Sequence, residues 1–163
     1  AADPVDLTPL PPDGWRLVTD GVMGGVSRGE LLREAPNGEA CTGFRGRVST
    51  DNNGGFIQIA LDVDADALTA GDHEGIRLEV RGNGEAYNLH LRTADLWLPW
   101  QSYRATFETT QEWQEVRLPF SDFSAYKTRS KLDVGRLRRI GIVAIGRDFE
   151  AALCVSDVHF YRD

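Results

Sequence analysis

Short stretches in which apolar and polar residues alternate recur along most of this 163-residue sequence, and they restrict its fold more than any other feature. In the clearest stretch, 55–63, every second residue is a large aliphatic one, namely Ile57, Ile59, Leu61 and Val63. A period of two places these side chains on one face of a strand, because successive residues of a strand point to opposite sides. Turn-forming Gly, Asn, Asp and Pro residues separate the stretches. The pattern therefore predicts an all-β protein.

About ten short strands are predicted in this way: 15–19, 25–34, 40–48, 55–63, 75–81, 87–93, 103–107, 113–118, 140–145 and 152–161. A Gly-Asn-Gly turn separates 75–81 from 87–93, and we expect these two strands to form a hairpin. Only 132–138 and 120–123 have the pattern of short helices. Many short antiparallel strands with little helix favour a β-sandwich or a β-barrel.

The length corresponds to about one domain. Four of the seven prolines lie in residues 1–14, and proline cannot donate a hydrogen bond to a β-ladder. We therefore expect an extended proline-rich arm over 1–14 and one β-domain over 15–163. No apolar run is long enough for a membrane span.

The charge is uneven. The whole chain has 18 Lys+Arg and 25 Asp+Glu, a net charge of −7, which disfavours binding to a nucleic-acid backbone. The segment 127–147 nevertheless holds seven basic residues and one acidic residue, Asp133. Two interpretations stay open: a basic patch for an acidic partner, or a solvated loop with a short helix.

The sequence has two cysteines, Cys41 and Cys154, which are too few to indicate a disulfide framework. Both lie in strand-like stretches, where a free cysteine packs as a small apolar side chain. We therefore expect both cysteines to be free. A bridge is the alternative if the two strands are neighbours. No signal peptide is visible, but a trimmed N-terminus would look the same, so the compartment stays open between cytoplasm and periplasm.

No pattern predicts a bound metal. The cysteines and histidines are scattered through the sequence, which disfavours a transition-metal site. The acidic stretch 62–66 fails the EF-hand spacing, although a structural calcium ion in 62–74 or 20–29 stays an alternative. We therefore predict no metal and no cofactor.

Catalytic motifs are also absent from the sequence. It has no Gly-x-Ser-x-Gly, no phosphate-binding Walker loop and no dinucleotide fingerprint. Of the three histidines, His90 and His159 alternate with apolar strand residues, so we expect them on outer faces of the sheets, away from the core. The expectation is a protein that is not an enzyme and has no catalytic residue.

Three turns rich in Gly and Asn are the most unusual segments of the chain. They cover 19–27, 51–56 and 81–87, and the first contains the only methionine, Met23. Glycine allows tight turns and close backbone approach, so turn geometry alone would explain all three.

Five blocks of the sequence, which include these three turns, resemble the CIA30 domain family, named after complex I intermediate-associated protein 30. The resembling blocks are TDGVMGGVSRG at 19–29, GFRGRVSTDNNGGF at 43–56, GIRLEVRGNGEAYNLHLR at 75–92, YRATFETTQEWQEVRLPFSDF at 103–123 and LRRIGI at 137–142. The resemblance implies a jelly-roll β-sandwich of the galactose-binding-like type. Around 146–150 charged residues replace the prolines usual in the family.

Members of this family assemble respiratory complex I in mitochondria, so the resemblance implies a non-enzymatic binding or assembly module for a protein partner, such as a complex I intermediate. The surface expected to bind it is formed by the three turns. Its candidate residues are Asp20, Met23, Gly24, Gly25, Ser27, Asn52, Asn53, Arg81, Asn83 and Tyr87.

A carbohydrate-binding module is the alternative. Jelly-roll modules stack sugars on exposed aromatic rings, and the segment 96–103 contains Trp97, Trp100 and Tyr103, with Arg92 nearby as a polar contact. The competing interpretation is that these rings pack on the core, as large aromatic residues mostly do.

Overall fold

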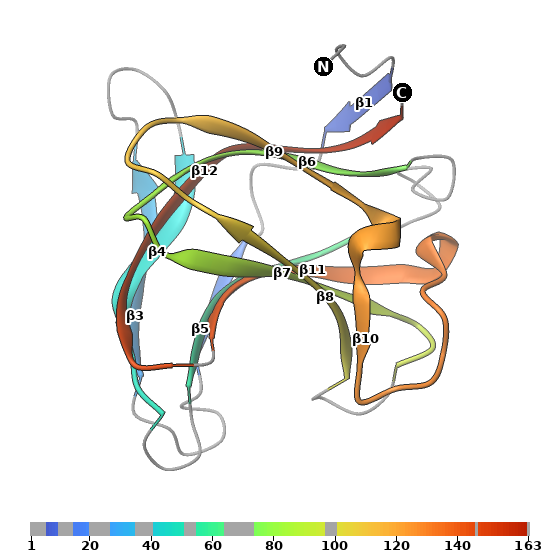
Figure 1. Ribbon diagram of the computed structural model, residues 1–163, viewed down its shortest axis with the longest axis horizontal. Coiled ribbons are helices and arrows are strands. Elements are labelled where there is room, and N and C mark those ends of the chain that lie inside the picture. Colours follow the sequence, from blue (N-terminus) through green and yellow to red (C-terminus); the bar gives the residue numbers. More distant parts are fainter. Residues whose placement is uncertain are drawn as a thin grey trace.

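The computed structural model describes residues 6–9, 15–19, 27–34, 41–50, 55–63, 74–96, 101–145 and 147–162. Twelve strands fill most of this part of the chain (Figure 1). They are β1 (Asp6–Pro9), β2 (Arg16–Thr19), β3 (Arg28–Glu34), β4 (Cys41–Val48), β5 (Phe56–Asp62), β6 (Gly75–Gly82), β7 (Ala86–Thr93), β8 (Ser102–Glu108), β9 (Gln114–Pro119), β10 (Ser124–Tyr126), β11 (Leu137–Ile145) and β12 (Phe149–Arg162).

The strands form two sheets that face each other. Sheet A has the order β3-β4-β12-β6-β9, with β1 paired to β12, and sheet B has the order β10-β8-β7-β11-β5-β2. All the pairings are antiparallel. The predicted all-β sandwich is therefore confirmed. Residues 6–9 of the predicted arm form β1 beside the C-terminal end of β12, as Figure 1 shows in blue and red.

The core lies between the two sheets and consists of the apolar half of each alternating pattern. In β5, Ile57 and Ile59 are fully buried and Leu61 is 3% exposed, as the period of two predicts. They pack with the inward-facing residues of the other strands, among them Phe44, Ile76, Leu78, Tyr87, Leu89, Leu91, Ile140, Ile142 and Phe160. The other half of each pattern, which faces away from the core, forms the two outer faces of the sandwich.

The predicted hairpin of 75–81 with 87–93 is wrong. Strand β6 pairs with β12 and β9 in sheet A, whereas β7 pairs with β8 and β11 in sheet B. The short connection takes the chain from one sheet to the other, with Gly84 at φ 86°. Alternation and a turn predict two strands, but they do not determine which partners those strands choose.

The expected helices are shorter than the sequence pattern indicated. The first is a 3₁₀ turn, η5 (Phe120–Asp122), and the second is a 3₁₀ turn, η6 (Val134–Arg136), after which β11 begins at Leu137. The strands β1 and β10 were not predicted. None of the helices in the described ranges is long and apolar enough to cross a membrane.

The expectation of two free cysteines is also wrong. Cys41 and Cys154 form a disulfide whose Cα atoms lie 5.6 Å apart. Strands β4 and β12 are neighbours, and Cys154 lies opposite Gly43, two residues along β4 from Cys41. The bridge therefore fastens two central strands of sheet A across a sequence separation of 113 residues.

Candidate binding face

The side of sheet B that faces away from the core gathers polar side chains from five strands. In Figure 1 sheet B forms an arch from β5 on the left to β8 on the right, and this side lies on the inside of the arch. We call it the sheet B outer face. Its central residues are Arg16 of β2, Gln58, Ala60 and Asp62 of β5, Asn88, His90 and Arg92 of β7, Ser102, Arg104 and Thr106 of β8, and Arg139, Gly141 and Val143 of β11.

Two small residues form the centre of this face. Gly141 of β11 lies opposite His90 on one side and opposite Ala60 on the other. The amide of Gln58 rests on Gly141, because its Oε1 lies 2.6 Å from the position that a Cβ there would take. Larger polar side chains of the adjacent strands surround this centre, so ligand groups would meet hydrogen-bonding atoms on several sides.

Two arginines share one carboxylate at the edge of the face. Arg16 donates from both terminal nitrogens to Asp62, at 3.1 and 3.2 Å, and Arg139 Nε donates to Asp62 Oδ1 at 3.1 Å. The hydrogen bonds from Arg16 and Arg139 hold the pKa of Asp62 below its usual value. Asp62 therefore stays ionised, and it supplies one negative charge to two guanidinium groups.

The other two arginines of the face each donate a hydrogen bond to a neutral group. Arg92 Nη1 donates to the carbonyl of Gln101 at 2.8 Å, and Arg104 Nε donates to Ser102 Oγ at 2.8 Å. The Arg104 guanidinium also lies over the Tyr126 ring, 3.6 Å from its centre. Burial lowers the pKa of both arginines, and the charge of Arg139 lowers that of Arg92 further. Arginine nevertheless keeps its charge in proteins.

His90 lies on the outer face, as the alternation predicted, but it is half-buried. Burial and the neighbouring Arg104 charge lower the pKa of His90 to about 3. Its Nε2 is buried and has no hydrogen-bond partner among the described residues. His90 is therefore neutral at physiological pH, and the folded protein opposes its protonation. His159, on the outer face of sheet A opposite Arg77, likewise has a buried Nδ1 to which no group in the described ranges is hydrogen-bonded.

The position of His90 predicts a pH-dependent stability. The pKa is about 3 in the folded protein and 6.5 in the unfolded chain, so the unfolded chain binds the extra proton. The stability contributed by neutral His90 is therefore fully present at a pH above 6.5, the pKa in the unfolded chain. It is lost as the pH falls from there toward about 3, the pKa in the folded protein. From pH 8 to pH 5, His90 is expected to remove about 2 kcal/mol of the free energy of unfolding.

Urea unfolding at the two pH values measures this loss, with His90→Gln as the matched variant. The variant should lose less stability than the parent over the same pH range, because its amide does not titrate. An identical loss in both proteins would contradict the assigned environment of His90.

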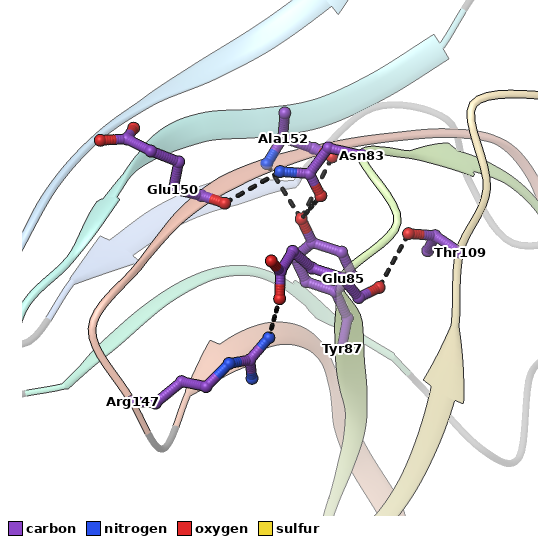
Figure 2. Close-up of polar contacts among 7 residues, drawn as sticks. All are labelled: Asn83, Glu85, Tyr87, Thr109, Arg147, Glu150 and Ala152. Carbon is purple, nitrogen blue, oxygen red and sulfur yellow. Dashed lines mark hydrogen bonds and ion pairs between the residues drawn. The ribbon is translucent and has the colours of Figure 1, made fainter.

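The predicted turn at 81–87 is held to β12 by two of its candidate residues, Asn83 and Tyr87 (Figure 2). Tyr87 is 1% exposed, and its hydroxyl donates to Asn83 Oδ1 at 2.6 Å and accepts from the Ala152 amide at 3.0 Å. Asn83 Nδ2 donates to the carbonyl of Glu150 at 2.9 Å. Burial raises the pKa of Tyr87, so the hydroxyl keeps its proton. These contacts join the two sheets at one corner.

Three residues that were not site candidates in the sequence analysis complete this corner, namely Glu85, Thr109 and Arg147. Arg147 forms an ion pair with Glu85 and lies 4.0 Å from the centre of the Phe149 ring, while Thr109 Oγ1 donates to the carbonyl of Glu85 at 2.8 Å. Figure 2 shows Glu85, Thr109 and Arg147 near Tyr87. The charges at 146–150 that depart from the family pattern supply Arg147, so part of that departure has a structural role here.

Two further candidate residues are engaged within the fold. Ser27 is buried, and its hydroxyl donates to the Ser49 carbonyl at 3.1 Å and accepts from the Ser49 amide at 2.8 Å. Arg81 lies 5.5 Å from the centre of the Trp113 ring. The remaining candidates of the partner surface lie outside the described residues: Asp20, Met23, Gly24, Gly25, Asn52 and Asn53.

The aromatic site expected for carbohydrate is described only in part. Trp97 and Trp100 lie outside the described residues. Tyr103 is 1% exposed, and its hydroxyl donates to the Ser130 carbonyl at 2.9 Å. Its ring therefore packs in the core and is not available to stack on a sugar. Arg92 is separate from this ring and belongs to the sheet B outer face.

Residues that could hold a metal ion do not come together in the described ranges, where no group of three His, Cys, Asp or Glu side chains is found. Most of the two segments in which a calcium ion was the alternative lies outside these ranges.

A comparison with protein families matches residues 7–155 to complex I intermediate-associated protein 30 (CIA30). The chain belongs to the CIA30 family. No curated protein matches this CIA30 domain. The prediction made from the five sequence blocks is therefore confirmed at the level of the family.

Solved structures similar to this CIA30 domain include carbohydrate-binding modules of Clostridium thermocellum. The family 11 module of the cellulase Lic26A-Cel5E has a TM-score of 0.79 at 10% identity, over 99% of this chain and 97% of that one. A family 11 module in complex with a β-1,3-1,4-mixed-linked tetrasaccharide has a TM-score of 0.75 at 11% identity, over 96% and 95%. The family 30 module of Cel9D-Cel44B has a TM-score of 0.66 at 14% identity, over 98% and 99%. At these identities the likeness establishes a shared jelly-roll fold.

Proposed function

We propose that this CIA30 domain is a non-catalytic module that binds a carbohydrate chain across the sheet B outer face. The observation that carries the proposal is the convergence of hydrogen-bonding side chains from five strands around Gly141 and Ala60. Among the described residues of this face the one histidine is His90, and it lies between Arg104 of β8 and Gly141 of β11. This row brings no nucleophile to His90, so we infer binding without catalysis.

The outer face of sheet A is a weaker candidate because its charges bind one another. Arg77 bridges Glu79 and Glu115 at 3.0 Å each, and Arg117 also pairs with Glu115. The pair of Arg47 with Glu150, at 2.9 Å, continues this pattern toward β4. Groups already engaged in this way gain less from a ligand, since each new contact would replace an existing one.

The polar character of the sheet B outer face favours a glycan over a protein. Protein interfaces usually have apolar and aromatic anchors at their centre. Among the described residues, the one large hydrophobic side chain that is exposed is Tyr126, at 39%. Amide, hydroxyl and guanidinium groups, in contrast, are those that bind sugar hydroxyls. The shared fold with carbohydrate-binding modules, one of them in complex with a tetrasaccharide, supports the same function.

The disulfide adds independent support. Disulfides persist in oxidising compartments such as the periplasm and the extracellular space, and they are rare in the cytosol. The Cys41–Cys154 bridge therefore favours a place among cell-envelope or extracellular proteins, where polysaccharides are abundant.

A protein partner is the second candidate, and family membership favours it. The family description refers to an intermediate of complex I, so an assembly intermediate of that complex is the partner to test. Affinity capture from the native cell would favour this candidate if it recovered complex I subunits.

The proposed function is tested by affinity electrophoresis through gels that contain neutral or acidic polysaccharides. We expect at least one polysaccharide to retard the protein, and we expect Asn88→Ala and Gln58→Ala to weaken binding by about tenfold, the loss of one to two hydrogen bonds. Arg28→Ala, on the exposed outer side of β3 in sheet A, is the matched control and should bind as the parent does. No retardation by any polysaccharide, or an equal loss in the control, would overturn the proposal.

A further inference from the structure

We propose that the ligand of the sheet B outer face is an acidic carbohydrate, whose uronate carboxylates bind Arg104 and Arg92. This inference rests on the proposed function and specifies its ligand. It comes from the charges on that face and from the way in which its arginines are held.

The first argument is the balance of charge. Four strands each place one arginine on the face: Arg16, Arg92, Arg104 and Arg139. The described carboxylates on the same side of sheet B are Asp62 and, toward the far end of β8, Glu108. The face therefore carries a local excess of positive charge, although the net charge of the whole protein is −7. The guanidinium groups could donate hydrogen bonds to a neutral glycan, but only an anionic glycan would also be attracted by their excess positive charge.

The second argument is the preparation of Arg104. Its Nε is bound to Ser102 Oγ and its plane rests on the Tyr126 ring, so the side chain is fixed before a ligand arrives. No carboxylate of the described residues forms an ion pair with it. The two terminal nitrogens of a fixed guanidinium form a planar fork that matches a carboxylate with two parallel hydrogen bonds.

The third argument is that burial and mutual repulsion make the positive charges of these arginines unfavourable in the free protein. Burial lowers the pKa of Arg104 and Arg92, and Arg139, directly opposite Arg92, lowers the latter further. A bound anion would relieve this repulsion, and a partly buried ion pair is screened less by salt than an exposed one.

The fourth argument is the mixture of groups. Beside the arginines lie Asn88 and Thr106, which are hydrogen-bonded to each other at 2.6 Å, and Gln58 over Gly141. Carboxylate and hydroxyl groups occur together on every residue of a uronate chain, so this ligand engages both sets. An acidic peptide would lack the hydroxyls, and its apolar side chains would find no exposed anchor here except Tyr126.

The test is isothermal titration calorimetry with hexagalacturonate and with its fully methyl-esterified, neutral form. We expect the acid to bind at least tenfold more tightly than the ester, with an affinity that falls as salt rises. Arg104→Gln should weaken binding of the acid about tenfold and binding of the ester much less, while Arg28→Gln should change neither. Thermal unfolding of each variant verifies that it is folded, and Arg92→Gln provides a second variant with the same expectation.

Equal binding of acid and ester, or binding of neutral polysaccharides alone, would overturn the acidic ligand and leave the proposed function standing. Failure of every acidic and neutral glycan would overturn both. Tighter binding of dextran sulfate than of hexagalacturonate would overturn the assignment to carboxylates, and tighter binding of hexaglutamate would overturn the assignment to a carbohydrate.

Discussion

Replacing Cys41 and Cys154 together by alanine is expected to lower the free energy of unfolding by about 2–4 kcal/mol. The bridge joins residues 113 positions apart, and a cross-link that closes a long loop restricts the unfolded chain most. Both cysteines are buried, so the variant also loses the packing of two sulfur atoms. For a domain of this size the melting temperature should fall on the order of 10 °C.

Urea unfolding with and without dithiothreitol measures the effect. The parent should lose stability when the bridge is reduced, while the double variant should be insensitive to the reductant. Two free thiols in the purified, unreduced parent, or an unfolding midpoint that is the same for parent and variant, would contradict the bridge.

Gly43→Ala is expected to destabilise the domain by about 3 kcal/mol or more. A Cβ at this position would lie 1.8 Å from the carbonyl oxygen of Leu153 and 2.8 Å from the Cα of Cys154. These are backbone atoms of β12, which is paired on both sides in sheet A and cannot withdraw as a flexible side chain could. The added methyl must therefore separate β4 from β12 or distort both strands.

Gly135→Ala is the matched control for this substitution. Gly135 is exposed in η6, and an added Cβ would meet only Asp133 Oδ1 at 3.3 Å. Urea unfolding should show a change within about 1 kcal/mol for this variant. Equal losses in the two variants would show that the close contact of β4 with β12 is not what requires glycine at position 43.

The arrangement of the strands could be predicted from the sequence in part. The alternation in 55–63 predicted which side chains of β5 are buried, because burial of one face follows from the period of two. The pairing of β6 and β7 could not be predicted in the same way, because strand partners depend on contacts distant in sequence. The Cys41–Cys154 bridge depends on the same information, since it requires β4 and β12 to be neighbours.

The candidate site was harder to predict than the fold. Unusual turns drew attention to Asn83 and Tyr87, whose described contacts fasten the corner between β7 and β12. The residues of the sheet B outer face instead occupy ordinary outward positions, such as Asn88, His90 and Arg92 in β7. A signal was present, since three successive outward residues of that strand are polar, but only the sheet order places them beside Arg104 and Gly141.

The most direct test of ligand binding on the sheet B outer face is a map of amide chemical shifts in 15N-labelled protein titrated with hexagalacturonate and with cellohexaose. The largest shifts should gather in β5, β7, β8 and β11 around Gly141, and they should appear with at least one of the two glycans. Shifts that gather on the outer side of β4, β12 and β6, or no shifts with either glycan, would contradict this location of the binding face.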